Sequence, residues 1–196
     1  MKLKFFFLFI TMLFIPKFYS QEIEYHVLMI GKPQEIFLKK DLNNNYSGKI
    51  ITKFYKPSKY FLGITLRKYS EIEIKTNLDS TIVKETINDL NKAGINSLEK
   101  FDSNEECKSI KFLDSDFLVF KINTQNSSET FEFSEVYPEE LNSNNIEKNF
   151  IRRKAQILIT LIDNKINLKE QFRIAEKNIS NPYCYSCGGI SSCCIE

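Results

Sequence analysis

Residues 22–30 read EIEYHVLMI, and two sets of side chains alternate along this stretch. One set is Ile23, Tyr25, Val27 and Met29, and the other is Glu22, Glu24, His26 and Leu28. Successive side chains of a β-strand point to opposite faces, so this period of two predicts a half-buried strand. The stretch therefore favours a sheet that buries one face and exposes the other.

Further strand candidates follow as far as residue 76. They lie at 35–39, 49–55, 60–66 and 70–76. The segments between them are rich in turn-forming residues: Gly31-Lys32-Pro33, the asparagine-rich 42–48, and Pro57-Ser58. Residues 21–76 are thus predicted to form a meander of short strands, and they are a possible β-rich subdomain.

A helix is predicted directly after these strands. Asp79 or Ser80 has the side chain of an N-cap residue, and Gly94 suits the left-handed conformation that ends many helices. The apolar positions that recur with the helical period are Ile82, Val83, Ile87 and Leu90. The helix is therefore expected to begin near residue 79 and to end before Gly94.

The middle of the chain predicts a second group of strands. After a polar loop at 99–106, strands are expected at 108–113, 117–122 and 130–136. The first two of these would be joined by a tight turn, Asp114-Ser115-Asp116. This group is predicted to form an antiparallel meander.

Two helices are predicted towards the C-terminus. Residues 145–163 carry apolar side chains at helical spacing, with Arg152, Arg153 and Lys154 expected on the opposite, solvent-facing side. A shorter helix is expected at 168–177. The predicted fold class is therefore α+β, with antiparallel sheet(s) packed by one central helix and by C-terminal helices. We expect a single domain over 21–180, followed by a cysteine-rich tail at 181–196.

Residues 1–20 have the pattern of a secretory signal peptide. Lys2 and Lys4 supply a basic beginning, and Phe5 to Ile15 form an apolar run of eleven residues. A membrane-spanning helix needs about 20 apolar residues, so cleavage near Ser20 is expected and no stable membrane span remains. The mature chain is predicted to be exported, to the periplasm or the cell exterior. The abundance of Asn, Lys, Ile and Phe suggests a bacterial origin.

The charge balance argues against general nucleic-acid binding. Loss of Lys2, Lys4 and Lys17 with the leader takes the 27 basic residues to 24, against 25 acidic residues. A basic surface is the usual electrostatic signature of proteins that bind nucleic acids. No nucleic-acid partner is therefore expected.

The cysteines are the most unevenly distributed residues in the chain. There are five, Cys107, Cys184, Cys187, Cys193 and Cys194, so four of them lie in the last thirteen residues. In an exported protein, such a cluster is expected to form disulfides. The sequence leaves the pairing and the unpaired cysteine open. The favoured arrangement joins Cys107 to one tail cysteine, while the tail closes a small loop of its own.

A thiol-redox or metal-thiolate protein is the alternative, because Cys184-Tyr185-Ser186-Cys187 is a C-x-x-C motif and Cys193-Cys194 lies close by. Two features of the context weaken this alternative. The motif follows Asn181-Pro182 and precedes Gly188-Gly189, which predicts a loop rather than the helix N-terminus of a thioredoxin-like site. Adjacent cysteines also differ from the spaced pairs of a tetrathiolate zinc site.

No catalytic site emerges from the remaining residues. His26 is the only histidine, it is placed on the strand face opposite Tyr25, and no nucleophile motif such as G-x-S-x-G accompanies it. Pairs of acids such as Glu71 and Glu73 on one strand face are ordinary solvated positions. We therefore predict no catalytic, cofactor-binding or metal-binding residues, and a protein that is not an enzyme.

The run from Thr81 to Phe120 resembles small exported bacterial proteins of unassigned function. The resemblance is carried by Lys92-Ala93-Gly94-Ile95 and Phe112-Leu113-Asp114-Ser115-Asp116, together with Phe131 to Pro138 and the cysteine-rich end. It implies no catalytic residues. Proteins of this class include inhibitors and immunity proteins. The leading hypothesis is an exported protein, stabilised by disulfides, that binds a protein partner.

Overall fold

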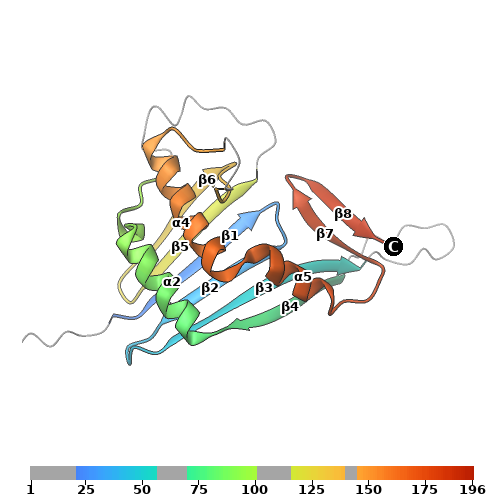
Figure 1. Ribbon diagram of the computed structural model, residues 1–196, viewed down its shortest axis with the longest axis horizontal. Helices are drawn as coiled ribbons and strands as arrows, with labels where there is room; N and C mark the ends of the chain where they lie inside the picture. Colours follow the sequence, from blue (N-terminus) through green and yellow to red (C-terminus); the bar gives the residue numbers. More distant parts are fainter. Residues whose placement is uncertain (1–20, 57–69, 101–115, 140–144) are drawn as a thin grey trace, which may run out of the picture.

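The computed structural model describes residues 21–56, 70–100, 116–139 and 145–196, which form an antiparallel eight-stranded sheet with helices on one face (Figure 1). The strands are β1 (Ile23–Ile30), β2 (Gln34–Lys40), β3 (Tyr46–Lys56), β4 (Ser70–Leu78), β5 (Phe117–Thr124), β6 (Ser128–Ser134), β7 (Tyr183–Gly188) and β8 (Ser191–Ile195). The helices are α2 (Ser80–Lys92), the short η1 (Ile95–Ser97), α4 (Phe150–Ile166) and α5 (Leu168–Glu176). The predicted α+β class is confirmed.

The spatial order of the strands is β6-β5-β1-β2-β3-β7-β8, and β4 also pairs with β3. One edge of β3 pairs with β4 from Gly48 to Lys56, and the other edge pairs with β2 only as far as Thr52. Beyond that point Tyr55 pairs with Cys184 of β7. Along this edge of β3, the β7–β8 hairpin therefore takes the place of β2 beyond Thr52, and it lies next to the turn between β1 and β2.

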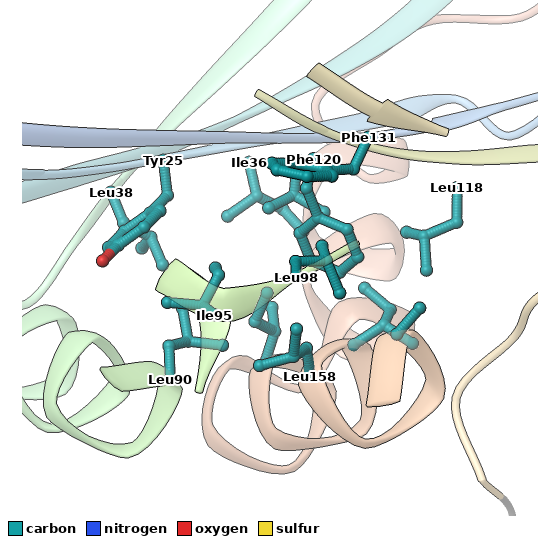
Figure 2. Packing of buried hydrophobic residues seen from close by; sticks show 14 of the residues in the cluster. Tyr25, Ile36, Leu38, Leu90, Ile95, Leu98, Leu118, Phe120, Phe131 and Leu158 are labelled. Carbon is teal, nitrogen blue, oxygen red and sulfur yellow. The ribbon is translucent and has the colours of Figure 1, made fainter. Parts of the chain in front are cut away.

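The main core lies between the sheet and the helices α2 and α4 (Figure 2). Tyr25 and Val27 of β1 are almost completely buried, as the alternation in residues 22–30 predicts. Their neighbours in the same core include Ile36, Leu38, Phe120, Phe133, Leu90 and Leu158. Burial of these side chains, at about 1.5–3 kcal/mol each, is the main force that holds the helices on the sheet.

A second, smaller core joins the C-terminal tail to the sheet. Phe54 of β3, Ala175 of α5 and Tyr183 of β7 are buried together, and Phe172 and Tyr185 pack against them. The ring centroids of Phe54 and Tyr183 are 5.4 Å apart in an edge-on arrangement. This cluster is the hydrophobic contact by which the tail docks.

The ends of α2 lie where the sequence predicts them. The Asp79 carboxylate accepts hydrogen bonds from the backbone N–H groups of Thr81 and Ile82, at 2.7 and 3.4 Å. Gly94 has the expected left-handed conformation, with φ of 82°. By contrast, α4 begins at Phe150 rather than near residue 145, because the Asn149 side chain caps it.

Other predictions have mixed outcomes. The strands expected at 35–39, 49–55, 70–76, 117–122 and 130–136 all occur, within a few residues at each end. The tail, expected as a loop, is a β-hairpin. The leader, the strands at 60–66 and 108–113, and Asp114 and Ser115 of the predicted turn lie outside the described residues. Across the described ranges, no helix combines the length and apolar character that crossing a membrane requires.

Candidate binding site

Two disulfides close the tail hairpin. Cys184 bonds to Cys194, and Cys187 bonds to Cys193, so both bridges join β7 to β8. All four tail cysteines are used within the tail, and the expected bridge from Cys107 to the tail is therefore wrong. Cys107 itself lies outside the described residues. The four cysteines are close together in the sequence, which favours this local pairing, since closing a short loop costs little chain entropy.

The pairing also bears on the thiol alternatives. Cys184 and Cys187, the two cysteines of the C-x-x-C motif, bond to different partners rather than to each other. Zinc sites use cysteine as thiolate, a form that none of the four sulfurs has when bonded in pairs. Within the described residues, no group of three or more His, Cys, Asp or Glu side chains is arranged to hold a metal ion.

A buried carboxylate holds the tip of the hairpin against the sheet. Asp116, which directly precedes β5, accepts a hydrogen bond from the backbone N–H of Gly189 and another from the Tyr137 hydroxyl at 2.9 Å. The Lys32 ammonium lies 3.4 Å from the same carboxylate. Burial acts to raise the pKa of Asp116, but these three contacts outweigh it and lower the pKa below its ordinary value. We call these four residues the Asp116 clamp.

The turn between β1 and β2 is shaped to fit this clamp. Gly31 has φ of 90°, and a Cβ atom at that position would lie 2.0 Å from the Asp116 carboxylate. A residue with a side chain would therefore both strain the backbone and displace the carboxylate. Lys32, the next residue, also donates to the backbone carbonyl of Cys187 at 3.3 Å. The turn thus contacts the hairpin on the β7 side of its tip.

Ile190 stands at the tip of this hairpin, and its side chain is 90% exposed. It lies between Gly189, which the Asp116 clamp holds, and Ser191, which begins β8. The Cys187–Cys193 bridge closes the strands just behind it. The tip therefore presents one large apolar side chain to solvent from a doubly fixed backbone.

A cleft of about 680 Å³ lies beside the hairpin, at the same end of the sheet. Its walls come from the turn between β1 and β2, the segment after β6, the junction of α4 with α5, and strand β7. We call it the hairpin cleft. The Lys32 and Tyr137 side chains of the Asp116 clamp line one part of it, so the clamp and the cleft share a wall.

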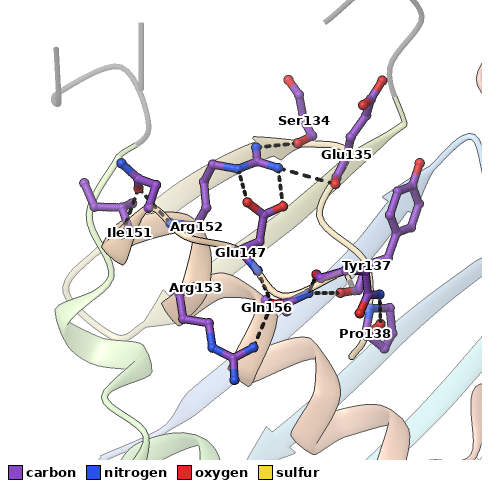
Figure 3. A network of polar contacts seen from close by, with 11 residues as sticks. Ser134, Glu135, Tyr137, Pro138, Glu147, Ile151, Arg152, Arg153 and Gln156 are labelled. Atoms are coloured by element: carbon purple, nitrogen blue, oxygen red, sulfur yellow. Dashed lines mark hydrogen bonds and ion pairs between the residues drawn. The ribbon is translucent and has the colours of Figure 1, made fainter. Parts of the chain in front are cut away.

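A network of polar contacts fixes the segment that carries Tyr137 (Figure 3). Arg152 of α4 is only 4% exposed, and it donates to the Glu147 carboxylate and to the backbone carbonyls of Ser134 and Glu135. The prediction that Arg152 faces solvent is therefore wrong. Arg152 lies at the edge of the buried face of α4, and its hydrogen-bond acceptors replace the water that its charged group loses on burial.

Gln156, one helical turn further along α4, is 99% buried and extends the same network. Its amide nitrogen donates to the backbone carbonyls of Tyr137 and Asn145, and its amide oxygen accepts from the backbone N–H of Glu147. The segments that carry Tyr137 and Asn145, which both line the cleft, are thereby bound to α4. The network holds the cleft wall in place rather than taking part in chemistry.

His26 lies on the face of the sheet opposite Tyr25 and the described helices, and it does not line the cleft. Its Nε2 is 2.9 Å from the Glu35 carboxylate, and its ring stacks on Phe37 with centroids 4.0 Å apart. Burial lowers the pKa of His26 below 6.5, although the hydrogen bond with Glu35 opposes this. The contacts described for His26 are with Glu35 and Phe37, and none of them is with a serine, threonine or cysteine nucleophile.

No protein family, no characterised protein and no solved structure matches this chain. The resemblance drawn from residues 81–120 stays a prediction.

Sequence reasoning identified the tail but missed the residues that fix it. The sequence predicts Asp116 only as part of a turn, and it predicts no contact with the tail for Lys32 or Tyr137. The one local signal is Gly31-Lys32-Pro33, because a glycine in a turn can mark a close approach by another segment. That the other segment is the C-terminal tail depends on contacts such as that of Lys32 with Cys187, 155 residues later in the chain.

The free energy of unfolding should fall as the pH is lowered from 7 to 5. The pKa of His26 is lower in the folded chain than its ordinary value of 6.5, so the unfolded chain binds the proton first and acid favours unfolding. Among the described residues whose pKa is shifted, only His26 has an ordinary pKa between 5 and 7. His26→Gln, which keeps a donor for Glu35, should flatten this part of the curve in urea titrations.

Asp116→Asn provides the matched comparison. The pKa of Asp116 is lowered from 3.8, so its contribution is present above that value and is lost only as the pH falls below it. This variant should change stability without changing the slope between pH 7 and 5. An unaltered slope in His26→Gln would contradict the assignment.

Proposed function

We propose that the chain is a disulfide-stabilised binding protein of an oxidising compartment outside the cytoplasm, and that the Ile190 tip docks into an apolar pocket of a protein partner. The observation that carries this proposal is the 90% exposed isoleucine on a backbone fixed by a disulfide and by the Asp116 clamp. An inhibitor or immunity-type role is one form that such binding takes.

The rigidity of the tip matters more than its hydrophobicity. Single exposed apolar side chains are common on protein surfaces and need no explanation by themselves. Binding, however, costs the entropy of ordering a loop, and a loop that is already fixed avoids that cost. Hot spots of protein interfaces are single anchoring side chains that fill a pocket of the partner. Ile190 combines exposure with a preorganised backbone, which supports a role as such an anchor.

The two disulfides support the proposed compartment. Disulfides persist where the environment is oxidising and are rare in the cytosol. The signal-peptide pattern of residues 1–20 is an independent argument for export. Periplasm and cell exterior both satisfy these two observations.

Ile190→Asp should weaken binding to the partner by roughly ten- to a hundredfold. Burying an isoleucine side chain contributes about 1.5–3 kcal/mol, and every 1.4 kcal/mol is tenfold in affinity. Residues 21–196 would be immobilised with the disulfides intact and exposed to an extract of the source cells' exported proteins. The retained protein would be identified by mass spectrometry, purified, and titrated against wild type and variant.

Leu42→Asp is the matched control. Leu42 is 50% exposed and lies in the turn between β2 and β3, at the opposite end of these strands from the hairpin tip. It should bind the partner as wild type does, and circular dichroism should show both variants folded. Equal affinity for wild type and Ile190→Asp, or an equal loss in Leu42→Asp, would refute the proposal.

A further inference from the structure

The hairpin cleft has the size and the lining of a small-molecule site. Its volume of about 680 Å³ lies within the range of roughly 300–1,000 Å³ that is typical of ligand pockets. Met29 lines it from β1, Pro33 from the turn between β1 and β2, and Leu168 from α5. The rings of Phe172 and Tyr185, with centroids 4.9 Å apart, form another part of the wall. This lining favours a ligand with a flat, apolar body.

One largely buried polar side chain in the lining uses only one end of its amide within the protein, and its other end keeps access to solvent. Gln34, which begins β2, is 94% buried, and its amide nitrogen donates to the backbone carbonyl of Leu168 at 3.1 Å. That hydrogen bond fixes the orientation of the amide, so its oxygen is the remaining group. No described residue donates to this oxygen. A ligand that supplies an O–H or N–H group at this point would satisfy it.

The charged side chains at the cleft also differ in whether they already have partners. Lys32 is already bound to the Asp116 carboxylate and to the Cys187 carbonyl, and Asp163 accepts from the backbone N–H of Leu168 at 2.9 Å. Lys169 lines the cleft, is exposed, and has no ion pair among the described residues. The available charge is therefore positive, which favours an anionic group on the ligand.

From these three observations we infer that the hairpin cleft binds a small amphipathic organic anion with an apolar body and one hydrogen-bond donor. The donor meets the Gln34 amide oxygen, and the anionic group meets the Lys169 ammonium. Ile190 does not line the cleft, so this site stands independently of the proposed protein partner. It would give one chain two separate binding functions at the same end of the sheet.

Anilinonaphthalene sulfonate is a suitable probe, because it has an aromatic body, a sulfonate and one N–H group. Its fluorescence rises in apolar surroundings, and titration into the folded, oxidised protein at pH 7 should saturate at one dye per chain. Its N-methyl derivative lacks the N–H donor and should bind roughly three- to tenfold more weakly, the usual size of one lost hydrogen bond. In Gln34→Leu, which removes the acceptor, the two dyes should bind equally.

Two further variants test the position of the site. Met29→Trp places a bulky ring in the cleft and should abolish binding of both dyes. Lys169→Glu reverses an exposed charge and should weaken both dyes roughly fivefold, as expected for an exposed ion pair. Lys177→Glu makes the same charge change at the other end of α5, about 12 Å away along the helix axis, and should leave binding unchanged.

Dye binding that Met29→Trp and Lys169→Glu leave unchanged would overturn the proposal, as would the absence of saturation. The same holds for equal affinity of the two dyes for wild type. If Met29→Trp does not unfold cooperatively in urea, Lys169→Glu still decides, because its side chain is on the surface. Ile190→Asp should keep full dye binding, so failure of this site and failure of the protein-partner proposal are distinguishable.

Discussion

Replacing Arg152 by methionine should lower the free energy of unfolding by about 3–5 kcal/mol, the usual cost of removing one partner of a buried ion pair. The Glu147 carboxylate, whose side chain is 19% exposed, would lose its bidentate partner. The backbone carbonyls of Ser134 and Glu135 would lose a donor as well. Urea unfolding at pH 7, followed by circular dichroism, measures the loss.

Arg153→Met is the comparison that isolates burial. Arg153 pairs with Glu139 at 2.8 Å, and both side chains are about 30% exposed. Arg153 also donates to the Gln156 amide oxygen, which keeps the backbone N–H of Glu147 as a donor when Arg153 is replaced. Such a pair contributes only about 0–1 kcal/mol, so its removal should change stability little. In Arg152→Met, the further change Glu147→Gln should recover part of the loss, because a neutral amide is less costly to leave unpaired. Similar small losses in both arginine variants would show that the network of Figure 3 is not a structural one.

Removing both tail disulfides should lower the free energy of unfolding by about 2–3 kcal/mol and should also remove the binding that depends on Ile190. The bridges close loops with sequence separations of 10 and 6. Loops of this length restrict the unfolded chain by about 2–3 kcal/mol each, and the smaller loop lies within the larger, so their effects overlap. The quadruple change to serine should therefore melt earlier and unfold at lower urea concentration.

Separate serine pairs resolve the two roles. Loss of Cys187 and Cys193 should chiefly weaken partner binding, because this bridge lies just behind the tip. Loss of Cys184 and Cys194 should chiefly reduce stability, because Cys184 joins the hairpin to Tyr55 of the sheet. Intact-mass measurement with alkylation of the denatured protein should detect one free thiol in wild type, at Cys107. An unchanged melting temperature in the quadruple variant would contradict a stabilising role.

The elements of the fold were largely predictable because their signals are local. The alternation in residues 22–30 identified β1, and Asp79 with Gly94 bounded α2 almost to the residue. The signal at the start of α4 was less clear, because apolar side chains precede the Asn149 cap. The β7–β8 hairpin was missed, because cysteine, serine and glycine dominate it and its register is set by disulfides rather than by an apolar pattern.

The candidate site was less predictable because it depends on distant contacts. Arg152 follows the polar face of a helical pattern, yet its acceptors are carbonyls 17 and 18 residues earlier in the chain. The Asp116 clamp brings together residues from the start, the middle and the end of the sequence. A single sequence contains no pairing information at that range, whereas the five cysteines were visible from composition alone.

The attachment of the hairpin to the sheet has a consequence for how this protein can evolve. Only one residue pair, Tyr55 with Cys184, joins β7 to β3 through the backbone ladder. The other anchors include the side chains of Asp116 and Lys32, the small aromatic cluster, and the hydrogen bond from the Tyr183 hydroxyl to Glu176, and none of these contacts involves the side chain of residue 190. Under the proposed function, substitutions at that one position would therefore change the partner that is recognised while the core stays the same. The tail would then act as a recognition element that varies independently of the sheet and the helices.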